Sequence, residues 1–168
     1  MAEQSSTVKD GRTISINGIH HVGMSVPDID RARDFYVDLL GFEEVNRVEW
    51  GGSDEVDAIM RLRGSSGRVM VLCTANAFIE MFEFATPVPD KLAGERAVNQ
   101  YGFTHLCLDV SDTDAAHARL VAAGMDFHCK PIGTAGVKAV YGRDPFGNVL
   151  ELQQIIDEGT MRRLPALA

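Results

Sequence analysis

The sequence has little positive charge and no long apolar run, and each shortage excludes a class of protein. It carries 16 Lys and Arg against 24 Asp and Glu, for a formal net charge of −8, and its longest basic cluster is Arg162-Arg163. Nucleic acid is bound by surfaces rich in Lys and Arg, so we expect no nucleic-acid partner. No apolar stretch approaches the ~20 residues that span a bilayer, so we expect no membrane partner.

Cysteine is also scarce. Cys73, Cys107 and Cys129 are widely spaced, form no CxxC pair and leave an odd thiol. This pattern suits a reducing compartment and is untypical of a disulfide framework or a zinc knuckle. The first 13 residues are polar and lack the apolar core of a secretory signal. We therefore expect a disordered tail at residues 1–13 and a cytoplasmic protein.

The rest of the 168-residue chain contains an internal repeat. GIHHVGMSVPDIDRARDFYVDLLGFE begins at Gly18, and GFTHLCLDVSDTDAAHARLVAAGMDF begins at Gly102. When His21 is placed on His105, the offset is 84 residues. At that offset further identical pairs fall together: Val26 with Val110, Asp28 with Asp112, Asp30 with Asp114, and Ala32 with Ala116. The chain therefore reads as two copies of one module.

Each copy opens with an alternating strand and continues into an amphipathic helix. The first helix is capped by Asp28 or Asp30, the second by Asp112 or Thr113, and Gly41 and Gly124 are left-handed terminators. An inserted short helix is expected after Ser53, and the turn DPFGN at 144–148 separates two strands. The remaining strands are expected at 43–49, 68–74, 77–84, 127–131, 137–143 and 148–154.

These elements give an α+β fold of two βαβββ modules. We expect the first module at residues 14–86, a linker at 87–99, the second module at 100–156 and a tail at 157–168. The apolar face of each first strand must lie under its own helix, because that is where apolar area is buried. His21 and His105 therefore project from the opposite face, and Glu80 and Glu151 share that face on the last strand of each module.

Two imidazoles and two carboxylates suit a divalent first-row metal ion, if the two sheets face each other across a cleft. Two alternatives remain open. His20 precedes His21, although its register favours the apolar face, and Glu83 could replace Glu80, although it falls on the opposite face of a regular strand. A second set of residues shares the cleft face and is a candidate substrate pocket: Phe78, Phe82, Cys107 and Asp109.

The segments HHVGMSVPDIDRARDFYVDLLGF, GFTHLCLDV and GRDPFGNVLELQ resemble the vicinal oxygen chelate superfamily over residues 17–155. That superfamily includes glyoxalase I, methylmalonyl-CoA epimerase, extradiol dioxygenases and the bleomycin and fosfomycin resistance proteins. The resemblance implies a cupped mixed sheet, and it implies that His21, Glu80, His105 and Glu151 bind a divalent ion: Ni, Co, Zn, Mn or Fe. IEMFEFATP differs from the corresponding segment of glyoxalase I, and the linker and GFTHLCL differ from the epimerase.

The leading interpretation is a metal-dependent lyase or isomerase that acts on a small-molecule carbonyl substrate. Glu80 or Glu151 would move a proton α to the carbonyl, and the ion would stabilise the enolate or enediolate. One alternative is an Fe(II) extradiol-type dioxygenase that uses His21, His105 and Glu151 as a facial triad. The other is a binding protein that sequesters a small molecule, as drug-resistance members do. We expect a homodimer, with a site formed within one chain or between two.

Overall fold

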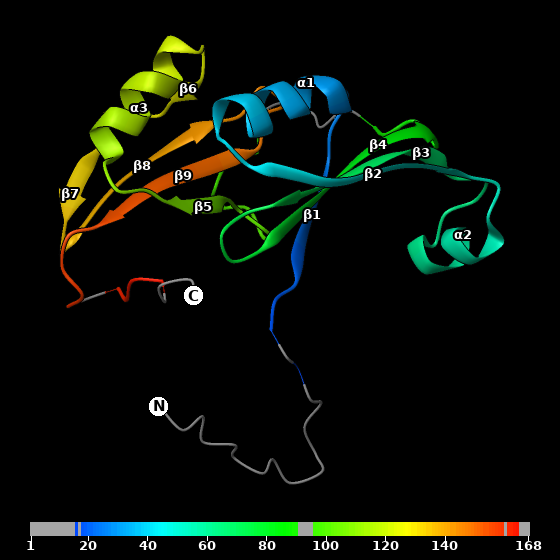
Figure 1. Ribbon diagram of the computed structural model, residues 1–168, viewed down its shortest axis with the longest axis horizontal. Coiled ribbons are helices and arrows are strands. Elements are labelled where there is room, and N and C mark those ends of the chain that lie inside the picture. Colours follow the sequence, from blue (N-terminus) through cyan, green and yellow to red (C-terminus); the bar gives the residue numbers. More distant parts are fainter. Residues whose placement is uncertain (1–15, 17, 91–95, 160, 165–168) are drawn as a thin grey trace, which may run out of the picture.

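The computed structural model describes residues 16, 18–90, 96–159 and 161–164 (Figure 1). The tail expected at residues 1–13 lies outside the described residues, as does part of the linker expected at 87–99. The described parts of that linker contain no helix or strand. Among the described residues, no helix is long and apolar enough to cross a membrane.

Two mixed sheets with the same strand order make up the fold. The first half contains β1 (His21–Ser25), α1 (Ile29–Arg33), a π-helix η1 (Asp34–Leu39), β2 (Glu43–Gly51), α2 (Asp54–Met60), β3 (Ser66–Cys73) and β4 (Phe78–Thr86). The second contains β5 (Leu106–Asp109), α3 (Thr113–Ala122), β6 (Asp126–Phe127), β7 (Ile132–Thr134), β8 (Val137–Arg143) and β9 (Val149–Ile155). The strand orders are β1-β4-β3-β2 and β5-β9-β8-β6, with β7 on β8.

In each sheet the first strand runs parallel to the last, β1 beside β4 and β5 beside β9, and the other pairings are antiparallel. The α+β class expected from the repeat is confirmed by these two equivalent sheets. Helices α1 and α3 lie on the same side of the two sheets (Figure 1). The opposite side of both sheets is therefore the face on which site residues are expected.

The helix ends follow from local chemistry. The side chain of Asp28 accepts hydrogen bonds from the amides of Asp30 and Arg31, and Asp112 accepts one from Ala115. These two carboxylates, rather than Asp30 and Thr113, are the caps, because they precede the first helical residue in extended backbone. The predicted left-handed glycines are confirmed after each helix, Gly41 with a φ of 80° and Gly124 with a φ of 89°.

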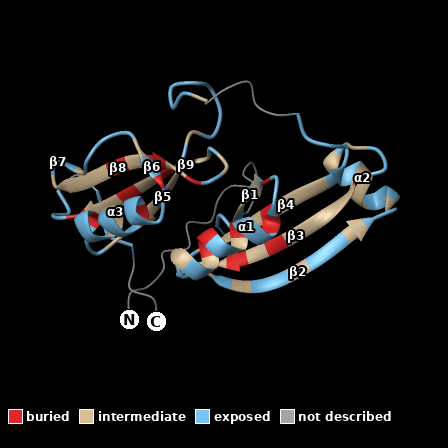
Figure 2. Ribbon diagram, turned by 90° about the horizontal axis from the view of Figure 1, so that it is seen from above, coloured by how far each residue is buried: buried red, intermediate tan, exposed pale blue. Residues whose placement is uncertain are grey.

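The core lies between the helices and the sheets. In the first half α1 and η1 bury Ile29, Ala32 and Tyr36 against Met70 and Met81 of the sheet. In the second half Leu120 of α3 belongs to the same buried cluster, together with Leu150 and Leu152 of β9. Figure 2 shows these buried stretches on the helices and on the strands beneath them. The apolar faces of the strands are thus taken up by the helices.

One strand prediction is wrong. The strand expected at 127–131 is interrupted: Asp126 and Phe127 pair with one end of β8, and Ile132–Thr134 pairs with its other end. Pro131 lies in the gap, and proline has no amide hydrogen with which to continue a ladder. The two short strands therefore share one partner without forming one strand.

The two halves meet where η1 reaches the turn between β8 and β9. The hydroxyl of buried Tyr36 donates to Oδ2 of Asp144 at 2.7 Å. Asp144 is itself buried and accepts from the amides of Phe146 and Asn148. Next to it, the guanidinium of Arg31 lies 5.6 Å from the ring centre of Phe146. These contacts join the first module's helix to a loop of the second module.

Candidate metal centre

In the first half, His21 and Glu80 lie on neighbouring strands and face each other. β1 runs parallel to β4, with His21 opposite Phe78 and Gly23 opposite Glu80. The two side chains therefore meet on a diagonal across the sheet face opposite α1, called the free face from here on. Nε2 of His21 lies 3.5 Å from Oε2 of Glu80. The flanking Ile79 and Met81 are buried beneath the helix. Strand alternation thus leaves the carboxylate on the open side.

The second half repeats this arrangement. His105 stands immediately before β5, where Cys107 is the register partner of Glu151 on β9. Nε2 of His105 lies 3.1 Å from Oε2 of Glu151. The side chain of Glu151 is 14% exposed and that of His105 is 28% exposed. Each module therefore presents one imidazole and one carboxylate as a pair at equivalent positions.

The two alternatives raised by the sequence occupy different places. Glu83 lies on the helix side, where its Oε2 accepts from the amide of Ile29 and from Arg68, both at 2.7 Å. Its carboxylate stabilises the first turn of α1, on the opposite face of the sheet from His21. His20 lies on the free face beside His21 and stacks on Phe78, so its expected place on the apolar face is wrong. His20 precedes the first residue of β1, so strand alternation does not set the direction of its side chain, and its ring lies over Phe78 of β4.

The four candidate ligands do not converge within one chain. Over residues 16, 18–90, 96–159 and 161–164, no three His, Cys, Asp or Glu side chains gather closely enough to hold an ion. Of the two arrangements that the sequence leaves open, a site within one chain and a site between two, the described residues of the isolated chain do not form the first. The sequence repeat makes the two pairs equivalent, but their relative placement depends on contacts between the modules, such as Tyr36 to Asp144.

Each pair by itself has the spacing of two ligands on one ion. Two donors about 2.1 Å from a first-row metal, at tetrahedral or octahedral angles, are separated by about 3.0–3.4 Å. The His–Glu separations of 3.5 and 3.1 Å are close to this span. Imidazole nitrogen with carboxylate oxygen is also a donor set that zinc, iron, cobalt, nickel and manganese accept. Each pair therefore offers two donors, an imidazole nitrogen and a carboxylate oxygen, whose type and spacing fit a divalent ion.

The surroundings of the two pairs differ. Beside Glu80, the rings of Phe82 and Phe84 stack with centres 5.7 Å apart, and Trp50 meets both edge-on. Trp50 lies directly over Gly67, where an added Cβ would meet its ring at 2.6 Å. The first half thus carries an aromatic wall next to its carboxylate, made of Trp50, Phe82 and Phe84.

The second half is polar around its carboxylate. Cys107 is an exposed residue, but partial burial of its thiol, and then the charge and hydrogen bond of Glu151, raise the pKa of that thiol to about 12. Tyr141 is the register partner of Glu151, and its ring centre lies 4.8 Å from that of His105. Burial and then the Glu151 charge raise its pKa. Tyr141 was not among the residues predicted from the sequence, although strand alternation along the predicted strand 137–143 would have put it on this face.

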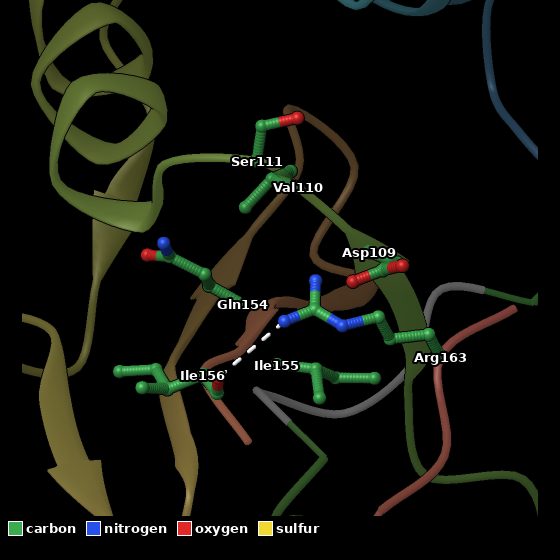
Figure 3. Close-up of a pocket in the computed structure, with 7 residues that line it drawn as sticks. All are labelled: Asp109, Val110, Ser111, Gln154, Ile155, Ile156 and Arg163. Carbon is green, nitrogen blue, oxygen red and sulfur yellow. Dashed lines mark hydrogen bonds between the residues drawn. The ribbon is translucent and has the colours of Figure 1, made fainter. Parts of the chain in front are cut away.

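Asp109 belongs to a hollow apart from the pairs, at the end of β5 and β9 (Figure 3). The hollow has a volume of about 330 Å³. Its lining residues are Asp109, Val110, Ser111, Gln154, Ile155, Ile156 and Arg163. Arg163 extends across it and donates to the carbonyl of Ile156 at 3.4 Å. The expectation that Asp109 lines the same pocket as the pairs is therefore not met by the single chain, and this hollow contains neither histidine.

Comparisons with known proteins bear on the family and the fold. A family model described as the Glyoxalase/Bleomycin resistance protein/Dioxygenase superfamily matches residues 18–152. A curated 2-epi-5-epi-valiolone epimerase from Actinomyces sp. is 30% identical over 149 residues, which cover 80% of this chain and 77% of the relative.

The solved structures agree in fold. A glyoxalase family protein from Bacillus cereus has a TM-score of 0.79 at 19% identity, covering 87% of this chain and 99% of that one. A fosfomycin resistance protein from Listeria monocytogenes has a TM-score of 0.59 at 16% identity, covering 83% and 94%. At these identities the likeness extends to the arrangement of strands and helices and no further.

Proposed function

Because the chain belongs to the Glyoxalase/Bleomycin resistance protein/Dioxygenase superfamily, we propose that it is a metal-dependent isomerase, an epimerase that moves a proton on the carbon next to a carbonyl group. The observation that carries this proposal is the pair of equivalent His–Glu contacts, 3.5 Å in the first half and 3.1 Å in the second. The named activity of the epimerase relative from Actinomyces sp. supports the choice of reaction among those of the superfamily.

The site is proposed to form between two copies of the chain. A single copy holds each His–Glu pair apart from the other among its described residues. If the first module of one copy faces the second module of its partner, one ion receives His21 and Glu80 from one chain and His105 and Glu151 from the other. A twofold dimer makes two such sites, because every contact is repeated by the symmetry.

A divalent ion bound there would polarise the substrate carbonyl and lower the pKa of the neighbouring C–H. The chain's own groups then handle the proton. Glu80 and Glu151 approach the cleft from opposite modules, so one carboxylate accepts the proton from one face of the carbon. The other residue, which starts as the neutral carboxylic acid, donates its proton to the opposite face and becomes a carboxylate, and the configuration inverts. His21 and His105 remain as fixed nitrogen ligands.

The walls of the cleft set limits on the substrate. The second module offers the Tyr141 hydroxyl next to Glu151, which can bind hydroxyl or carbonyl oxygens. The aromatic wall of Trp50, Phe82 and Phe84 offers ring faces to C–H surfaces on the other side. A polyhydroxylated ketone ring, with oxygens at its rim and C–H bonds on its faces, would satisfy both sides.

The test is exchange of solvent deuterium into a ketone substrate. Protein loaded in turn with Zn²⁺, Co²⁺, Ni²⁺, Mn²⁺ and Fe²⁺ is incubated in D₂O with 2-epi-5-epi-valiolone and with simple α-hydroxyketones. We expect deuterium at the carbon next to the carbonyl and the appearance of the epimer. Glu80→Gln and Glu151→Gln should each lower the exchange rate by roughly 10²–10⁴-fold, since each removes a proton-transfer group.

Glu49→Gln is the matched control, because this exposed carboxylate lies on β2 away from both pairs. Its exchange rate should equal that of the unmodified protein. Exchange that survives in both site variants would remove Glu80 and Glu151 from the reaction. Failure of every metal-loaded form to exchange any ketone of the panel would refute the epimerase proposal.

A further inference from the structure

Each site histidine is also held on the side that faces away from its carboxylate. Nδ1 of His21 lies 3.0 Å from Nδ1 of His20. Nδ1 of His105 lies 2.8 Å from Oγ1 of Thr104. In both halves the partner is the residue immediately before the histidine in the sequence. The repeat therefore includes a hydrogen bond behind each ring as well as the carboxylate in front of it.

Both partners can donate or accept a hydrogen bond from the same position. The threonine hydroxyl rotates about its C–O bond, and an imidazole nitrogen donates in one tautomer and accepts in the other. A backbone carbonyl, the more common partner of a ligating histidine, can only accept. His20 and Thr104 therefore match the Nδ1 of their neighbours whether or not that nitrogen carries a hydrogen.

The ability of His20 and Thr104 to donate or accept matters because Nε2, on the other side of each ring, must carry a hydrogen in one state and a lone pair in the other. Without an ion, the hydrogen of the neutral His105 ring can sit on Nε2, 3.1 Å from Oε2 of Glu151, which leaves Nδ1 as an acceptor for the Thr104 hydroxyl. To serve as a ligand, Nε2 must present a lone pair, and the hydrogen of the neutral ring must then sit on Nδ1. That hydrogen donates to Oγ1 of Thr104, whose own hydrogen turns away.

We propose that His20 and Thr104 are positioning residues of the candidate metal centre, which hold His21 and His105 by Nδ1 in both tautomers. Nε2 can then lose its hydrogen and present a lone pair to a metal ion without reorientation of the ring. The inference rests on the proposed metal-dependent function. One hydrogen leaves Nε2 and one arrives at Nδ1, so the ring stays neutral. In the first half a second hydrogen shifts within His20, from Nδ1 to Nε2.

His20 has a further contact that fixes its own ring. It stacks on Phe78, with ring centres 5.0 Å apart and planes inclined by 19°. Phe78 is the register partner of His21 across β1 and β4. The ring of His20 is thus held parallel to a strand residue while its Nδ1 faces His21. His20 therefore has two possible roles, packing on Phe78 and hydrogen bonding to His21, and a variant that keeps the ring but removes the nitrogen distinguishes them.

The first measurement is Zn²⁺ affinity, by competition with a chromophoric chelator. Thr104→Val removes the hydroxyl at nearly constant shape, and His20→Phe keeps a ring on Phe78 while it removes the nitrogen. Each should weaken Zn²⁺ binding by about 10–100-fold, the usual effect of losing the partner of a ligating histidine. Thr104→Ser should restore the affinity. Thr134→Val, an exposed threonine of β7, is the matched control and should bind as the unmodified protein does.

The second measurement is the tautomer, read from long-range ¹H–¹⁵N correlations of the imidazole rings at about pH 8. We expect His21 and His105 to carry hydrogen on Nε2 in the metal-free protein and on Nδ1 with Zn²⁺. Equal Zn²⁺ affinity in Thr104→Val and the unmodified protein would overturn the positioning role and leave the proposed function intact. A metal-free protein already in the Nδ1–H tautomer would overturn the tautomer change. If the unmodified protein binds no Zn²⁺, Co²⁺ or Mn²⁺, the proposed function fails and this inference fails with it.

Discussion

Replacing Tyr36 by Phe removes a buried hydrogen bond between the two modules and nothing else. The hydroxyl donates to Oδ2 of Asp144 at 2.7 Å, and Tyr36 is 0% exposed. A hydrogen bond to a charged group contributes about 1.5–3 kcal/mol. Asp144 keeps the amides of Phe146 and Asn148 and the Asn148 side chain as donors, so its carboxylate is not left unpaired. We therefore expect a loss of about 2 kcal/mol in the free energy of unfolding.

For a chain of this size such a loss lowers the Tm by about 4–8 °C, because each kcal/mol corresponds to about 2–4 °C. Thermal and urea unfolding of Tyr36→Phe, followed by circular dichroism, measure both quantities. Tyr101→Phe is the matched control, because the Tyr101 side chain is fully exposed. It should leave the Tm unchanged. A Tyr36→Phe protein as stable as its parent, within about 0.5 kcal/mol, would refute the claim that this contact joins the modules.

Alkaline pH gives a second signature of the same contact. Burial, and then the charge and hydrogen bond of Asp144, raise the pKa of Tyr36 well above its ordinary value of 10. The stabilisation is complete below the pKa of the unfolded chain and is lost as pH rises through the folded pKa. Above pH ~10 the unfolded chain releases this proton first, so the parent should lose stability faster than Tyr36→Phe, by at most ~1.4 kcal/mol per pH unit. Parallel pH profiles of the two proteins would contradict this assignment.

Two further predictions concern the free face of the sheets. Gly67→Ala should lower the free energy of unfolding by roughly 1–3 kcal/mol in urea, because its Cβ would meet the Glu83 carbonyl and, at 2.6 Å, the Trp50 ring. An unchanged urea midpoint would contradict this close packing around Gly67. In the metal-free protein at pH 8, iodoacetamide should alkylate Cys107 about 50-fold more slowly than an ordinary thiol, because its pKa is raised to about 12. Peptide mass spectrometry measures the rate, and Glu151→Gln should accelerate it; an equal rate in the variant would exclude Glu151 as a cause.

Much of the fold was predictable because its causes are local. The repeat fixed the equivalence of the two modules, strand alternation put the apolar residues of β1 and β9 under the helices, and Gly41 and Gly124 ended the helices as expected. The broken strand around Pro131 shows the limit of this reasoning. A period-2 pattern predicts which face each side chain occupies. It does not predict that Pro131, which has no amide hydrogen, lies where the hydrogen bonds to β8 are interrupted.

The two His–Glu contacts were predictable from the sequence, but the placement of the two pairs relative to each other was not. Alternation puts His21 beside Glu80 and His105 beside Glu151, because both contacts form within one sheet. The distance between the pairs depends on how the modules pack, and that packing uses residues such as Tyr36 and Asp144, 108 positions apart in the sequence. No periodic pattern in either segment records this contact. The hydrogen bonds of His20 and Thr104 were missed for another reason, since side-chain direction before a strand is not set by alternation.

The central claim is that one metal site takes one His–Glu pair from each of two chains, and mixed dimers test it most directly. One chain carries His21→Ala with Glu80→Ala, the other carries His105→Ala with Glu151→Ala, and each bears a different affinity tag. Neither should bind metal as a homodimer. In the heterodimer the intact first module of one chain faces the intact second module of the other, so one complete site per dimer should return, with metal bound and deuterium exchange restored. A folded heterodimer that binds no metal, beside an unmodified dimer that does, would contradict the claim.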